Sequence, residues 1–175
     1  MKRKLILFMI PAFALMFMSA QAQDKPSPSP MAKVTQMAGT TEITIEYSRP
    51  SLKGRTIFPD MHKYGEFWRT GANAATKISF SKDVIAEGKS LSAGSYAILT
   101  KPGEKNWEVY FYTYDQGGWN SYPSQDPAAK VMVEADEIGC EVESFLINLT
   151  DLRDNSATLG LVWGTTYVPI SLGLK

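Results

Sequence analysis

The feature that most constrains the fold is an alternation of apolar and polar residues with a period of two. Ile43, Ile45 and Tyr47 alternate with Thr44 and Glu46, and similar short segments recur toward the C-terminus. Successive side chains of a strand point to opposite faces, so this period predicts strands that bury one face. The segments with this pattern are 43–47, 78–80, 96–100, 107–114, 131–135, 142–149, 159–163 and 167–172.

Turn residues lie between several of these predicted strands. Segments 87–89, 102–104 and 163–166 read EGK, PGE and WGTT, and glycine at such places favours a tight reversal of the chain. After the N-terminal region, no segment has the 3.6-residue period of an amphipathic helix. The sequence therefore predicts an all-β fold, an antiparallel two-sheet sandwich, with jelly-roll and immunoglobulin-like connectivities both open.

The first 22 residues have the three parts of a secretory signal peptide. Basic Lys2, Arg3 and Lys4 precede an apolar run at 5–18, and small residues follow up to Ala22, where cleavage is expected. The apolar run is too short to span a bilayer comfortably. We therefore expect a periplasmic or secreted protein whose mature form has no membrane span.

The rest of the chain predicts a short tether and one domain. Residues 23–30 are rich in Pro and Ser, which favours an extended tether, and 31–175 form the predicted single β-sandwich domain. The lone cysteine, Cys140, precedes a predicted strand and is interpreted as a small buried hydrophobic residue. The chain has 18 basic and 18 acidic residues. Loss of the basic N-terminus leaves an acidic chain, which argues against a nucleic-acid partner.

One candidate site combines the loop that starts at residue 48 with the stretch EFWRTGANAAT at 66–76. Arg49, Lys53 and Arg55 have the same parity, so in an extended chain they point to one side. With Arg69 and Asn73, these cations can bind a carboxylate, sulfate or phosphate by forked hydrogen bonds. The predicted ligand-binding residues are Arg49, Lys53, Arg55, Trp68, Arg69 and Asn73.

Each part of this candidate site has a structural alternative. The arginines can instead pair with nearby carboxylates and fasten the loop to the sandwich. The ring of Trp68 can stack on a ligand or anchor the returning chain in the core. A second candidate, the row of Tyr110, Tyr112 and Tyr114, is either a platform for a sugar or peptide or, if covered, part of a core.

Catalytic residues are scarce. His62 is the only histidine, which excludes a zinc site with several histidines, and no nucleophile elbow of the G-x-S-x-G type is present. An envelope hydrolase would have to use His62 or a pair of carboxylates, and their spacing selects no pair. The sequence therefore predicts no cofactor and no metal site.

The motifs YSRP-x-x-KGR at 47–55 and WRTGAN at 68–73 resemble domain-of-unknown-function family 2911. The resemblance extends over about 34–172 and includes L-x-AG-x-Y at 91–96 and W-x-V-x-F at 107–111. It implies an exported bacterial protein of the Bacteroidetes type, but no activity, substrate or cofactor. It also singles out the two motifs that contain the first candidate site.

These observations favour a non-catalytic binding module for an anionic small molecule, a glycan or a peptide. Two alternatives stay open. One is the envelope hydrolase, and the other is a structural or assembly partner that pairs with another envelope protein through a strand edge or an exposed face.

Overall fold

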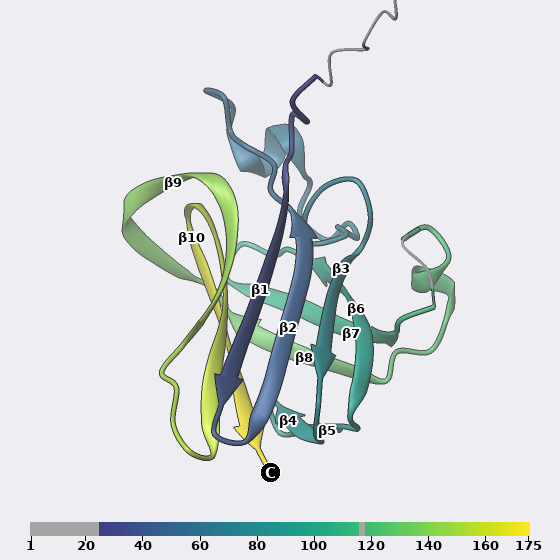
Figure 1. Ribbon diagram of the computed structural model, residues 1–175. Helices are drawn as coiled ribbons and strands as arrows, with labels where there is room; N and C mark the ends of the chain where they lie inside the picture. The colour runs from purple at the N-terminus through teal and green to yellow at the C-terminus, as the bar shows by residue number, and fades with distance from the viewer. Residues whose placement is uncertain (1–24, 116–117) are drawn as a thin grey trace, which may run out of the picture.

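The computed structural model describes residues 25–115 and 118–175 (Figure 1). The predicted signal peptide at 1–22 lies outside these residues, as does the start of the tether. The strands are β1 (Met31–Ala38), β2 (Thr41–Ser48), β3 (Thr76–Phe80), β4 (Val84–Ala86), β5 (Lys89–Leu91), β6 (Gly94–Lys101), β7 (Asn106–Thr113), β8 (Ala129–Glu134), β9 (Asp136–Thr150) and β10 (Ser156–Leu174). Two short helical turns, η1 (Ile57–Met61) and η2 (Tyr122–Ser124), lie in the long loops after β2 and β7.

The strands form two antiparallel sheets. The larger sheet has the order β1-β2-β3-β6-β7-β8 and the smaller sheet the order β5-β4-β10-β9. This confirms the predicted two-sheet sandwich. The jelly-roll option fits the connectivity poorly, because a jelly roll alternates successive strands between its sheets, whereas β1, β2 and β3 stay in one sheet, as do β6, β7 and β8.

The core between the sheets is made by the inward faces of the alternating segments. Ile43, Ile45 and Tyr47 of β2 are buried and belong to one apolar cluster with Leu159 and Leu161 of β10. Full burial of one such aliphatic side chain stabilises a fold by about 1.5–3 kcal/mol. Burial of the apolar residues that recur with a period of two therefore stabilises the packing of the two sheets.

A second, smaller cluster covers the outer face of the larger sheet. Tyr110 and Tyr112 of β7 are buried there together with Tyr122, which comes from the loop between β7 and β8. Trp119 of the same loop is partly buried against them. The row of tyrosines is therefore mainly a core and not the open platform that was one of its two interpretations.

Strand β10 folds back on itself. The backbone N–H of Leu174 donates to the carbonyl of Asn155 at 2.9 Å. A straight strand of this length would hold these residues roughly 60 Å apart, so the chain must reverse between them. The middle of the segment is Gly164, whose φ of 58° lies in the left-handed region. The reversal thus falls within the turn predicted at 163–166, and Figure 1 shows β9 curving widely around it.

Several features differ from the sequence prediction, among them the short strands β4 and β5, which were not expected. Strand β1 was not expected, because its side chains are mostly exposed or half-buried and it is held by backbone pairing with β2 over its whole length. Strand β9 begins at Asp136 instead of near 142, and its first half is largely exposed. Cys140 lies in that half and is exposed, so its interpretation as a buried residue is wrong.

Candidate functional site

The predicted loop after β2 is fastened to β9. Arg49 donates from Nε to the carbonyl oxygen of Phe145 at 2.8 Å, and the Ser51 and Ser144 hydroxyl oxygens lie 2.7 Å apart. The backbone N–H of Leu52 donates to the carbonyl of Glu143 at 2.9 Å. Arg49 therefore serves as a fastener, as in the structural alternative, although its partner is a backbone carbonyl and not a carboxylate.

The structure places Trp68 in the core. Its side chain is 3% exposed, and its ring stacks on that of Trp163 with centroids 5.6 Å apart. Its indole N–H donates to the carbonyl of Gly71 at 2.9 Å. This bond closes the corner formed by the WRTG stretch and satisfies a donor that burial would otherwise leave unpaired. Trp68 thus anchors the returning chain.

Asn73 and Arg69 contact other residues than Arg49 and Trp68 do. Asn73, at a φ of 61°, donates from Nδ2 to the Ser29 carbonyl at 3.3 Å and to the Ser48 hydroxyl at 3.2 Å, which holds the chain just before β1. The guanidinium of Arg69 lies 5.7 Å from the ring centroid of Trp119. Its buried Nε has no hydrogen-bond acceptor among the residues that the structure describes.

Lys53 and Arg55 lie on the exposed part of the loop. Arg55 donates from Nε to the Leu52 carbonyl at 2.9 Å and from Nη2 to the Ser51 carbonyl at 3.0 Å. The backbone N–H of Lys53 donates to the Glu143 carboxylate at 2.8 Å. The six predicted site residues thus use separate partners. Of these six, Arg55 alone lines the pocket described next.

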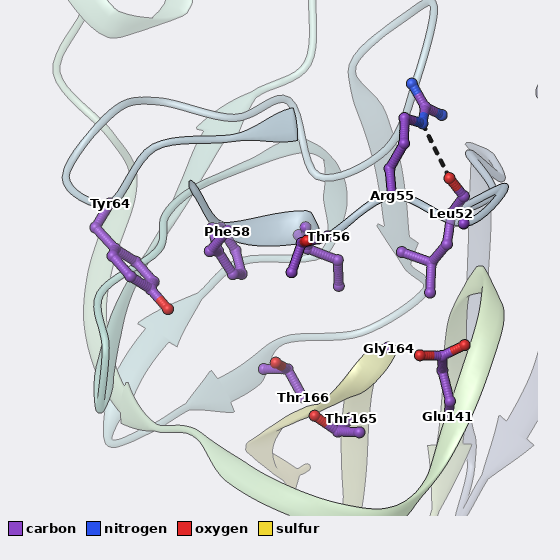
Figure 2. A pocket seen from close by; sticks show the side chains of 11 residues that line it. Leu52, Arg55, Thr56, Phe58, Tyr64, Glu141, Gly164, Thr165 and Thr166 are labelled. Carbon is purple, nitrogen blue, oxygen red and sulfur yellow. Dashed lines mark hydrogen bonds between the residues drawn. The ribbon is translucent and has the colours of Figure 1, made fainter. Parts of the chain in front are cut away.

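A pocket of about 440 Å³ opens between the loop at 52–58 and the bend of β10 (Figure 2). One wall is the loop itself with Phe58, and Tyr64 closes one end. The opposite wall is Thr165 and Thr166 at the β10 bend, with Glu141 from the curved part of β9. The pocket therefore joins three segments that are far apart in the sequence.

Gly164 lies where the two walls meet, next to the side chain of Ile57. A Cβ atom at this position would lie 2.9 Å from Cδ1 of Ile57, a separation that real Cβ contacts do not show. The left-handed φ of Gly164 is also reached easily only by glycine. On the loop side, Lys53 and Gly54 both have a positive φ, so the chain turns there and brings 55–58 over the bend.

The pocket contains aromatic, hydroxyl and carboxylate groups. The rings of Phe58 and Tyr64 stack with centroids 4.7 Å apart and planes inclined by 21°. Figure 2 shows Glu141 extending from β9 toward Leu52, whereas the guanidinium of Arg55 turns toward the Leu52 carbonyl and away from the hollow. The pocket thus offers one stacked aromatic pair and several oxygen atoms, with few free cationic donors.

His62 belongs to the same loop but does not line this pocket. Its ring centroid is 4.9 Å from that of Trp68 and 5.9 Å from that of Trp163. Burial, with a smaller contribution from the positive charge of Arg69, lowers the pKa of His62 from 6.5 to about 4. The imidazole ring of His62 is therefore neutral at pH 7. A hollow of about 150 Å³, lined also by Asp60 and Glu66, adjoins it.

Sequence reasoning missed most of the pocket. Tyr64 and Glu141 carried no motif, and the two threonines were noticed only as part of a turn. Their position beside the turn glycine Gly164 was the available signal. In the described part of the chain, no three His, Cys, Asp or Glu residues are grouped so that they could hold a metal ion. No helix in that part has the length and apolar character needed to cross a membrane.

Comparison with known proteins gives one match. The family DUF2911, described as a protein of unknown function, matches residues 29–172. This range contains every residue of the pocket and both sheets except the last two residues of β10. No curated protein and no solved structure matches the chain.

Proposed function

Because the chain belongs to DUF2911, a family of unknown function, only its own site indicates what it does, and we propose that it is a non-catalytic binding module. The ligand is a small polar molecule or the end of a glycan or peptide. It binds between the 52–58 loop and the bend of β10. The observation that carries this proposal is the pocket of about 440 Å³ that these segments enclose.

The size and lining of the pocket support a ligand site. Pockets that bind small molecules have volumes of roughly 300–1,000 Å³ and combine aromatic surface with a few polar groups. Here the stacked Phe58 and Tyr64 supply aromatic surface, and Glu141, Thr165 and Thr166 supply oxygen atoms. The walls are held by backbone bonds from Leu52 to Glu143 and by the fold-back of β10. Little reorganisation is needed for binding, which favours affinity.

Binding without catalysis is favoured by the surroundings of His62. With a pKa of about 4, its imidazole is a weak base, poorly matched to general base catalysis near neutral pH. Its ring packs against both Trp68 and Trp163, and within the described residues no hydrogen bond holds it against a carboxylate or a nucleophile. A catalytic base is normally oriented by such a bond.

The signal-peptide pattern at 1–22 is the basis for proposing that the module is exported. In the periplasm or outside the cell, such a module would bind a solute or a component of the cell surface. Detection of the mature N-terminus at Gln23 in a periplasmic or culture fraction tests this part of the proposal.

The binding proposal is tested with one blocking variant and one matched control. Thr165 is exposed and lines the pocket, so Thr165→Trp fills the space without disturbing the core. Thr113 is equally exposed on β7, away from the pocket, and Thr113→Trp serves as the control. The purified proteins are screened by thermal shift and calorimetry against glycans, sugar acids, amino acids and short peptides. We expect saturable binding that Thr165→Trp abolishes and Thr113→Trp retains.

Two results would contradict the proposal. One is the absence of saturable binding to every member of the panel. The other is binding that Thr165→Trp leaves unchanged, because the ligand would then occupy another part of the surface.

A further inference from the structure

We infer that the ligand of this pocket is an uncharged oligosaccharide, which packs at one end of the pocket against Tyr64 and hydrogen-bonds along the pocket to the threonines of the β10 bend and to Glu141. The inference rests on the proposed function and narrows it to one chemical class. It also departs from the anionic ligand that the sequence alone favoured for the arginine-rich loop.

The first argument is the aromatic surface. Tyr64 is 45% exposed, and one face of its ring stacks on Phe58, with centroids 4.7 Å apart. Phe58 in turn packs edge-on against the core residue Trp107, with centroids 5.7 Å apart and planes at 88°. The Tyr64 ring is therefore held in place by Phe58, which itself packs against the core. A flat ring with a polar tip suits a sugar, whose C–H groups cover the face while its hydroxyls reach the edge.

The second argument is the set of polar groups. Thr56, Thr165 and Thr166 line the pocket with hydroxyls, which both donate and accept hydrogen bonds. Glu141 adds a carboxylate, which accepts only. Within the described residues, none of these four side chains makes a hydrogen bond to the protein itself, so all remain available to a ligand. Sugar hydroxyls, which also donate and accept, match such a set.

The third argument is charge. Arg55 is the one basic residue that lines the pocket, and two of its donors are already used by the Leu52 and Ser51 carbonyls. Glu141 faces the hollow, and no ion pair joins it to a basic residue in the described part of the chain. An anionic ligand would therefore meet the Glu141 carboxylate, whereas the charged guanidinium of Arg55 points away from the hollow, and such like-charge contacts weaken binding. An uncharged ligand avoids this cost.

The test compares glycans that differ in charge. A glycan array is probed with the purified protein, and the array contains neutral sugars, uronic-acid and sulfated sugars, and amino sugars with a free amine. Calorimetry on the best binder then compares wild type with Tyr64→Ala, Tyr64→Phe and Glu141→Gln. Tyr64 and Glu141 are both exposed, so these variants are expected to fold.

We expect the array to select neutral glycans, with an affinity that changes little with salt concentration. Tyr64→Ala should weaken binding about fivefold to tenfold, because the stacking surface is lost, whereas Tyr64→Phe keeps the ring and most of the affinity. Glu141→Gln should weaken binding about tenfold or more, because a hydrogen bond to a charged acceptor becomes a neutral one.

The outcomes separate this inference from the proposed function. Selection of acidic glycans, with binding that Glu141→Gln strengthens and Thr165→Trp abolishes, would overturn the uncharged ligand but keep the pocket as the site. Selection of amino sugars through their charged amine, again blocked by Thr165→Trp, would do the same. Binding of any glycan that Thr165→Trp leaves intact, or no binding on the array, would overturn the inference. If Thr165→Trp leaves glycan binding intact, the proposed function is contradicted as well.

Discussion

Gly164 lies so close to Ile57 that a Cβ atom on the glycine would sit 2.9 Å from the Ile57 Cδ1 atom. At this contact, the bend of β10 meets the loop that follows β2. Both segments continue into the walls of the pocket. A side chain at position 164 would therefore require the end of the Ile57 side chain, which lines the pocket, to move.

Replacement of Gly164 by alanine should destabilise the fold. The alanine would be strained at a φ of 58°, at a cost of about 1–2 kcal/mol, and its Cβ would push against Ile57. For a chain of this size we expect the midpoint of thermal unfolding to fall by about 2–8 °C. Gly173→Ala is the control, because its Cβ would meet Ile85 at an ordinary 3.4 Å. Equal midpoints for the two variants would contradict the role given to Gly164.

The two arginines of the sequence motifs should differ in their effect on stability. Arg49→Ala removes a charged donor from the Phe145 carbonyl, and such bonds contribute about 1.5–3 kcal/mol. Arg69→Ala removes a side chain whose buried Nε has no acceptor among the described residues and whose guanidinium lies over Trp119, a contact that contributes about 0.5–1 kcal/mol. Urea unfolding should therefore show the larger loss for Arg49→Ala. The reverse order would argue against Arg49 as the main fastener.

His62 should make the protein less stable in mild acid. In the folded protein its pKa is about 4, whereas the unfolded chain binds the proton below about pH 6.5. Between these values the unfolded state holds more protons, so the free energy of unfolding rises with pH across this window and its His62 contribution is constant above it. One pKa unit corresponds to about 1.4 kcal/mol, and screening at the half-buried ring reduces the effect, so we expect a change of about 1–2 kcal/mol.

The control for this dependence is His62→Gln, which cannot take up the proton. Unfolding by urea at several pH values from 4 to 7 gives the difference between the two proteins, and carboxylates common to both cancel. Wild type should lose more stability than the variant between about pH 6.5 and 4. Parallel curves would mean that the ring is not held in the environment described here.

Cys140 should react in the folded protein. It lies in the exposed half of β9, next to Glu141 in the sequence. A thiol reagent should therefore modify about one thiol per chain without denaturant, at a rate close to that of a free thiol. If modification needed denaturant, the first half of β9 would be covered in solution. Cys140→Ser should abolish the reaction.

The sequence was sufficient for the fold class but not for the strand order or the site. The period of two placed Ile43, Ile45 and Tyr47 in the core because a strand fixes the direction of each side chain, and the glycine at 164 marked a real reversal. The parity of Arg49, Lys53 and Arg55 was a weaker guide. Parity holds only along an extended backbone, and the turn at Lys53 and Gly54 ends that run before Arg55.

The remaining site residues depend on long-range contacts. The partner of Arg49 is the carbonyl of Phe145, which is 96 positions away in the chain. Tyr64, Glu141 and Thr165 meet around the pocket only because β9 curves around the bend of β10. Local sequence patterns do not specify contacts between residues that are far apart in the chain. The pocket could therefore be identified only from the folded structure.

The most direct test of the central claim is a map of backbone amide chemical shifts. The isotopically labelled protein is titrated with the neutral glycan that binds best on the array. The account predicts saturable shifts that are largest around Tyr64, Glu141 and Thr165. Shifts confined to the surroundings of Arg69 and Asn73, or no saturable shift with any glycan, would contradict it.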